Sequence, residues 1–204
     1  MVKKIAVIGA GSWGTALSVL LANKGMTVKL WVHGKHVHHQ IAVARENTKY
    51  LPGVMIPGNV FPAQALDEVL NDVEATVLAV PSQYIRSLAR QISPFIAKDH
   101  VIVNVAKGLE TGSLYRMSQV IQQEISDARV VVLSGPSHAE EVGRGIPTAV
   151  VSASPNKTDS EYVQDIFMSP CFRVYTNPDI IGVEMGGALK NVIALAAGIN
   201  DGLG

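Results

Sequence analysis

The 204-residue sequence has one cysteine, no acidic residue before Glu46, and no apolar run of the roughly 18 residues that a membrane helix needs. The lone thiol, Cys171, cannot form an internal disulfide, so a reducing cytoplasm is the expected compartment. The apolar segment that follows Lys3 and Lys4 runs directly into glycines and is too short for a signal-peptide core. The sequence therefore predicts a cytoplasmic protein without a membrane span.

Negative charge is missing from the start of the chain. The first 45 residues hold six lysines and arginines, four histidines and no carboxylate, whereas the whole chain carries 17 basic and 17 acidic residues. A basic segment of this kind suits a small polyanionic ligand. Nucleic acid is the competing interpretation, which we discount because the basic residues are scattered and lack an accompanying set of aromatic residues for base stacking.

The strongest motif lies within the first 15 residues. A continuous apolar run, residues 5–8, leads into Gly9, Gly11 and Gly14, and a helical pattern follows at once. In this G-x-G-x-x-G spacing Gly9 permits a tight turn, Gly11 lets the backbone approach a pyrophosphate, and Gly14 lets the helix pack closely on the strand. The motif predicts a dinucleotide site; a turn that serves strand–helix packing alone is the alternative.

Apolar strands and helices alternate along the rest of the chain. Strands are expected at 27–32, 75–80, 101–106, 130–133, 148–153 and 172–175, and helices at 63–72, 83–95, 114–125, from 138, 158–168 and 182–199. Residues 45–62, with three prolines, are expected to form a long loop. The order predicts an α/β fold with a Rossmann-like, doubly wound and mainly parallel sheet.

Ligands of such sheets bind beyond the carboxyl ends of the strands. His33 follows the second strand, where a NAD-selective site usually carries an acid that bonds the ribose 2′-hydroxyl. Since His33 and Lys35 could instead attract a 2′-phosphate, we expect NADP to be accepted, with stacking of His33 near the adenine as the alternative. The histidines at 36, 38 and 39 are interpreted as a solvated helix start, so no metal site is expected.

Two lysines are placed unusually. Lys107 directly follows the fourth strand, and Lys190 is the one charge in an apolar, glycine-rich stretch between Glu184 and Asp201. Burying a lysine without a partner is costly. Lys190 is therefore either a lysine whose amine reaches the surface or a catalytic amine that exchanges a proton with a reacting oxygen. We expect Lys107 and Lys190 to meet across one crevice.

Several motifs, in order over the whole chain, resemble the bacterial NAD(P)-dependent glycerol-3-phosphate dehydrogenases. They are the glycine motif, the Tyr-Leu-Pro core of residues 47–53, Val-Pro-Ser at 80–82, Lys-Gly-Leu-Glu at 107–110, Ser-Gly-Pro-Ser at 134–137 and Gly-Gly-Ala-Leu-Lys-Asn-Val at 186–192. The family commonly has arginine at the position of His33.

The resemblance implies reversible reduction of dihydroxyacetone phosphate to sn-glycerol 3-phosphate with NADP or NAD, which supplies phospholipid synthesis. It places Ser12, Trp13, His33, Lys107 and Ala139 at the cofactor, in addition to Gly9, Gly11 and Gly14. It places Lys107, Gly135, Ser137 and Lys190 at the substrate, with Lys190 exchanging the proton. The residues alone gave no reason to choose Ala139.

Family members continue into a helical domain that completes the substrate site. The resemblance therefore implies a dinucleotide-binding domain at 1–180 and, at 181–204, the first helix of a truncated α-helical domain. We expect the 204-residue chain to bind cofactor better than substrate and to be nearly inactive alone; a homodimer of the full-length protein is left open. The alternatives are another two-domain Rossmann dehydrogenase, such as a ketopantoate or hydroxy-acid reductase, and a dinucleotide-binding sensor that is not an enzyme.

Overall fold

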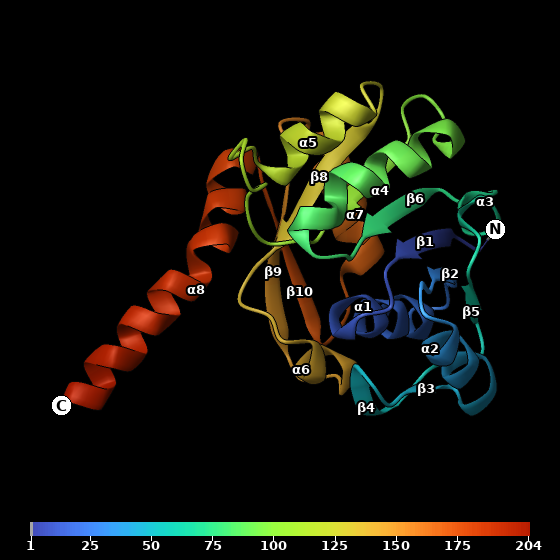
Figure 1. Ribbon diagram of the computed structural model, residues 1–204, viewed down its shortest axis with the longest axis horizontal. Coiled ribbons are helices and arrows are strands. Elements are labelled where there is room, and N and C mark those ends of the chain that lie inside the picture. The colour runs from blue at the N-terminus through green and yellow to red at the C-terminus, as the bar shows by residue number, and fades with distance from the viewer. Residues whose placement is uncertain (1) are drawn as a thin grey trace.

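Eight strands form one sheet across the middle of the computed structural model, which describes residues 2–204 (Figure 1). The order is β10-β9-β8-β7-β6-β1-β2-β5. The strands are β1 (Lys4–Ile8), β2 (Thr27–Trp31), β5 (Val60–Ala63), β6 (Ala75–Leu78), β7 (Val101–Asn104), β8 (Arg129–Ser134), β9 (Thr148–Ala153) and β10 (Phe172–Asn177). All neighbours from β5 to β8 are parallel, which confirms the predicted doubly wound architecture.

Helices cover both faces of this sheet (Figure 1). The helices of the chain are α1 (Ser12–Asn23), α2 (Lys35–His39), α3 (Leu66–Leu70), α4 (Ile85–Ile92), α5 (Met117–Glu124), α6 (Ala139–Gly143), α7 (Lys157–Phe167) and α8 (Ile180–Leu203), of which α8 projects away from the sheet (Figure 1). Alternate side chains of β1 enter different cores: Ile5 and Val7 pack with α1 and α7, while Ala6 and Ile8 pack with α4 and α5. This two-sided burial explains why the strands are continuous apolar runs.

The sheet changes direction once. β9 runs antiparallel to β8 and pairs with it through only three residue pairs, 132–134 with 151–153. β10 then pairs in parallel with β9 along six residues. Because the carboxyl ends of β8 and β9 overlap, β10 ends near the carboxyl edge of the parallel strands, and α8 begins there.

The prediction of a long loop at 45–62 was wrong. The segment contains a two-stranded ribbon, β3 (Glu46–Asn47) and β4 (Leu51–Met55), and then β5, which extends the sheet beside β2. Arg45, in a left-handed conformation with φ 53°, donates side-chain hydrogen bonds to the carbonyls of Ile56, Pro57 and Val60. Pro62 is tolerated because β5 is an edge strand, where a missing ladder N–H costs little.

The expected helix at 114–125 starts later than predicted, at Met117. Leu114 has φ 60°, which is incompatible with a right-handed helix, and Arg116 instead bridges back to Leu109 in an antiparallel pair. The residues before α5 thus form a closed turn that carries Lys107 at its start.

Candidate active site

The turn between β1 and α1 needs two of its three glycines for packing. Gly9 has φ 116°, and a Cβ there would lie 2.6 Å from the carbonyl oxygen of Ala79. A Cβ on Gly14 would lie 1.9 Å from the carbonyl oxygen of Gly9. Gly11 is different, because a Cβ there would meet nothing within 4 Å. Protein packing therefore does not explain Gly11, whereas a ligand that approaches its backbone would.

The start of α1 is suited to an anion. Gly11 is its N-cap; within residues 2–204 no side chain caps this end, and the first turn contains no acidic side chain. The backbone N–H groups of that turn and the positive end of the helix dipole remain available to a phosphate. Together with the open space at Gly11, this end of α1 fits the pyrophosphate of a dinucleotide.

Asn47 of the β3–β4 ribbon holds the glycine turn from the side. The side chain is fully buried, and its Nδ2 donates to the carbonyl of Ala10 at 2.9 Å and to the Thr15 hydroxyl at 2.8 Å. Its Oδ1 accepts from the backbone N–H of Tyr50 at 3.3 Å. Sequence reasoning missed this residue because it lay in a presumed loop.

Replacing Asn47 with alanine is expected to weaken dinucleotide binding. The change leaves the Ala10 carbonyl and the Thr15 hydroxyl without this donor, at a cost of about 1–3 kcal/mol in stability, and frees the turn that faces the pyrophosphate. Asn59→Ala is the matched control, because Asn59 also donates two bonds to backbone carbonyls, those of Ala22 and Met26 at the far end of α1. Calorimetric titration with NADPH should show weaker binding for Asn47→Ala alone; equal affinities would refute the role.

Most of the sequence-predicted cofactor residues line two hollows at the carboxyl edge of the sheet. One, of about 420 Å³, is lined by Gly11, Ser12, Trp13, Ala79, Val80, Pro81, Val105, Ala106, Lys107, Ser137, His138, Ala139 and Glu140. The next, of about 460 Å³, shares Gly11 and Pro81 with it and reaches Gly9 and His33. The structure thus brings the glycine turn, His33, Lys107 and Ala139 into one continuous crevice, and Gly14 lies behind it as a packing residue.

His33 lies at the outer end of the crevice. The exposed imidazole is 5.6 Å from the Trp31 ring, centroid to centroid, at an interplanar angle of 47°. A third hollow of about 560 Å³ adjoins it and is lined by Trp31, His33, Tyr50, Val80, Pro81, Tyr84, Ser87, Leu88 and Gln91. Aromatic and imidazole rings at this end give a nucleoside base surfaces on which to stack.

Lys107 points from the end of β7 toward the turn after β8. Its Nζ donates to the carbonyl of Gly135 at 3.0 Å and to the Ser137 hydroxyl at 3.4 Å. Burial, and secondly the positive charge of Lys190, lower the pKa of Lys107 below its ordinary value. Lys190 is therefore among the charges that act on Lys107.

Lys190 reaches the same place from α8. A hollow of about 410 Å³ is lined by Ser134, Gly135, Pro136, Val151, Gly182, Val183, Gly186, Gly187, Lys190 and Ile193. The close approach depends on Gly187, where a Cβ would lie 2.8 Å from Ser134 Oγ and 3.7 Å from Lys107 Cγ. Lys107 and Lys190 thus both lie beside the turn that contains Gly135 and Ser137, next to a hollow whose lining is mostly apolar.

The second half of α8 is exposed and largely apolar, unlike the half that packs near the turn at 134–137. Residues 191–203 are all exposed, and they include Val192, Ile193, Leu195, Ile199 and Leu203. By length and composition alone, α8 is the one helix in the described part of the chain that could cross a membrane. The sequence count had excluded such a span because Glu184 and Lys190 interrupt the apolar residues.

Comparisons with known proteins agree along the whole chain. Residues 4–160 match the family model described as the NAD-dependent glycerol-3-phosphate dehydrogenase N-terminus, and residues 179–204 match the model of its C-terminus. The glycerol-3-phosphate dehydrogenase [NAD(P)+] of Moorella thermoacetica is 56% identical over 204 residues, which cover all of this chain and 61% of that protein. The corresponding protein of Bacillus subtilis is 51% identical, covering 99% and 59%.

Solved structures give the same result. The crystal structure of glycerol-3-phosphate dehydrogenase from Coxiella burnetii matches with a TM-score of 0.92 and 37% identity, covering 99% of this chain and 62% of that one. The yeast glycerol-3-phosphate dehydrogenase matches with a TM-score of 0.88 and 28% identity, covering 100% and 64%. The chain spans 58–61% of the length of the first curated relatives that it matches.

Proposed function

The chain belongs to the NAD-dependent glycerol-3-phosphate dehydrogenase family, and from that premise we propose that it serves the reversible, NAD(P)-dependent reduction of dihydroxyacetone phosphate to sn-glycerol 3-phosphate. The observation that carries the proposal is the pair of amines, Lys107 and Lys190, beside the turn at 134–137 and next to the glycine crevice. Supply of phospholipid synthesis is the role that we propose for the product.

The dinucleotide would lie along the crevice, with its pyrophosphate at the start of α1 and its adenosine end near His33. The nicotinamide supplies a hydride to the substrate carbon when it is bound. Lys190 then donates a proton to the oxygen on which negative charge develops, and the ammonium of Lys107 stabilises that charge. The hydrogen bonds from Lys107 to Gly135 and Ser137 hold its amine in place.

The residues after β2 support acceptance of NADP. His33, Lys35 and His36 stand where a carboxylate would select against a 2′-phosphate. The absence of an acid among these residues makes NADPH a substrate in this proposal, while an exposed imidazole at His33, in place of a guanidinium, leaves room for NADH.

We propose that residues 1–180 form the dinucleotide-binding domain and that α8 opens the helical substrate domain. The charges in α8 support this over a membrane span, because Glu184 is buried against α5 and Lys190 lines the hollow beside the turn at 134–137. The exposed apolar half of α8 would then be covered within the helical domain, and the protein would work in the cytoplasm.

The deciding experiment is oxidation of NADPH and of NADH with dihydroxyacetone phosphate, measured on the complete reading frame. We expect turnover with both cofactors, and binding of NADPH with very little turnover by the 204-residue chain alone. Turnover only with ketopantoate or another keto acid would favour a different dehydrogenase. Tight NADPH binding without turnover of any of these substrates by the complete protein would favour a sensor.

A further inference from the structure

The segment that carries Lys107 is closed on itself. The Lys107 loop, residues 105–116, joins β7 to α5. The backbone N–H of Glu110 donates to the Tyr115 carbonyl at 2.9 Å, the N–H of Leu114 donates to the Glu110 carbonyl at 3.0 Å, and Leu109 pairs with Arg116. The end of the loop at Arg116 is therefore tied to Leu109, two residues after Lys107.

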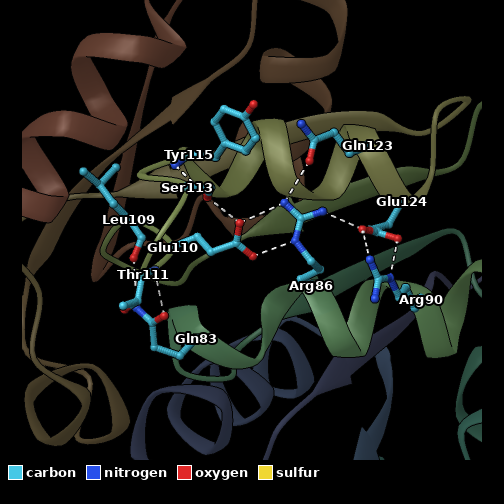
Figure 2. A network of polar contacts seen from close by, with 10 residues as sticks. All are labelled: Gln83, Arg86, Arg90, Leu109, Glu110, Thr111, Ser113, Tyr115, Gln123 and Glu124. Carbon is cyan, nitrogen blue, oxygen red and sulfur yellow. Dashed lines mark hydrogen bonds and ion pairs between the residues drawn. The ribbon is translucent and has the colours of Figure 1, made fainter.

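Helix α4 holds the middle of the loop (Figure 2). Arg86 donates two hydrogen bonds to the Glu110 carboxylate, Nε to Oε1 at 2.6 Å and Nη2 to Oε2 at 2.8 Å, and a third, at 2.5 Å, to Glu124 of α5. The guanidinium and the Ser113 hydroxyl lower the pKa of Glu110 to about 2, so this pair is ionised at neutral pH. Gln83 Nε2 donates to the Leu109 carbonyl, and the Thr111 N–H donates to Gln83 Oε1. This side of the loop is fixed to the dinucleotide-binding domain.

Helix α8 is attached to the other end of the same loop. Arg116 Nη1 donates to Glu184 Oε2 at 2.7 Å, and Ser118 donates to Glu184 from its backbone N–H at 2.8 Å and from its hydroxyl at 2.6 Å. The side chain of Glu184 is only 5% exposed and that of Arg116 17% exposed. A carboxylate so deeply buried is stable only when it is paired, and these three donors provide the pairing.

Glu184 therefore links the helix that carries Lys190 to the segment that carries Lys107. It precedes Lys190 by six residues on the same helix, a rise of about 9 Å. Its partner Arg116 pairs with Leu109 and so closes the Lys107 loop. Gly187, between Glu184 and Lys190, lets α8 lie close to Lys107 and Ser134, because a Cβ at this position would come within 4 Å of both side chains.

We propose that Glu184 is a positioning residue that sets the separation of the Lys107 and Lys190 amines by fixing α8 to the Lys107 loop. This inference rests on the proposed function, since it gives Glu184 a role only through those two lysines. Glu184 lines neither the hollows that we assign to the dinucleotide nor the hollow beside Lys190, and the dinucleotide hollows are lined only by residues that precede α8.

A matched ion pair elsewhere provides the control. Arg129 Nη1 donates to Asp159 Oδ1 at 2.7 Å, and the Asp159 side chain is also 5% exposed. This pair joins β8 to α7, and the other side-chain hydrogen bond of Arg129 goes to the Asp99 carbonyl, away from the Lys107 loop and α8. Loss of the buried carboxylate at this site shows how far breaking a purely structural ion pair changes stability and kinetics.

The test compares Glu184→Gln with Asp159→Asn in the complete enzyme. Glu184→Gln is expected to lower kcat with dihydroxyacetone phosphate on the order of 10²-fold, the usual cost of a misplacement of about 1 Å in an active site, with the Kd for NADPH unchanged. Asp159→Asn is expected to lower the melting temperature but to leave kcat, KM and the Kd for NADPH as in the wild type. If Glu184→Gln does not fold, Arg116→Lys, which keeps the charge but shortens the reach, gives the same comparison.

A second background separates positioning from stability. When Lys190 is already alanine, Glu184→Gln is expected to lower kcat by less than about twofold further, because a residue that acts through Lys190 has nothing left to position. Full additivity of the two changes, or kinetics of Glu184→Gln equal to those of Asp159→Asn, would overturn the inference. Failure of the proposed function looks different: wild-type enzyme without turnover of dihydroxyacetone phosphate, or Lys190→Ala with full turnover.

Discussion

Lys190→Ala is expected to lower kcat for reduction of dihydroxyacetone phosphate by about 10²–10⁴-fold in the complete enzyme, the range that a positioned proton donor contributes. The amine lies beside the turn at 134–137 and close to Lys107, so its loss removes the proposed proton donor and one of two positive charges at the developing alkoxide. The Kd for NADPH should stay unchanged, because the hollow assigned to the dinucleotide does not include α8.

Stopped-flow turnover and fluorescence titration with NADPH check both parts of this prediction. Lys157→Ala is the control, since Lys157 is an exposed lysine of α7 that pairs only with Glu161, one turn away. Its kinetics should match those of the wild type. A Lys190→Ala enzyme that keeps its turnover, or that loses NADPH binding instead, would contradict the assigned role.

Gly11→Ala and Gly14→Ala are expected to separate ligand binding from packing. A Cβ at Gly11 faces open space, so Gly11→Ala should fold normally yet bind NADPH at least about tenfold more weakly, or ~1.4 kcal/mol, because the methyl group occupies the place of the pyrophosphate. A Cβ at Gly14 would collide with the Gly9 carbonyl, so Gly14→Ala should lose both affinity and stability, by about 1–3 kcal/mol or more.

Thermal unfolding and calorimetric titration of the two variants give the comparison. For a chain of this size 1 kcal/mol moves the melting temperature by about 2–4 °C, so a shift of several degrees is expected for Gly14→Ala alone. If Gly11→Ala binds NADPH as the wild type does, the pyrophosphate does not lie at this turn.

Most of the sheet could be predicted because its strands are buried on both faces. Residues 5–8, 75–78 and 101–104 read as strands in isolation, since continuous apolar runs have few alternatives. Residues 60–63 do not, because Pro57, Gly58 and Pro62 are typical of turns. β5 forms only because it pairs with the edge of β2 and because Arg45 donates hydrogen bonds to the carbonyls at its start. Tertiary contacts decided this segment against its local preference.

Residues of the candidate site could be predicted where a charged side chain stands in or next to an apolar segment. They could not be predicted where the role of a side chain comes from a hydrogen bond to a residue far away in the sequence. Lys107 follows an apolar strand, and Lys190 is a lone charge in an apolar helix. Asn47 instead acts through a hydrogen bond to Ala10, 37 residues away, and Glu184 through one from Ser118, 66 residues away. Without coordinates, neither partner can be identified from spacing or composition.

The exposure of α8 bears on the stability of the candidate site. Glu184 is the one buried residue of this helix, and residues 191–203 are all exposed. Because so few buried contacts hold α8, it can open at a free energy below that of global unfolding. Such an opening would carry Lys190 away while the glycine turn stayed folded, so the proposed proton donor would be lost before the proposed dinucleotide site.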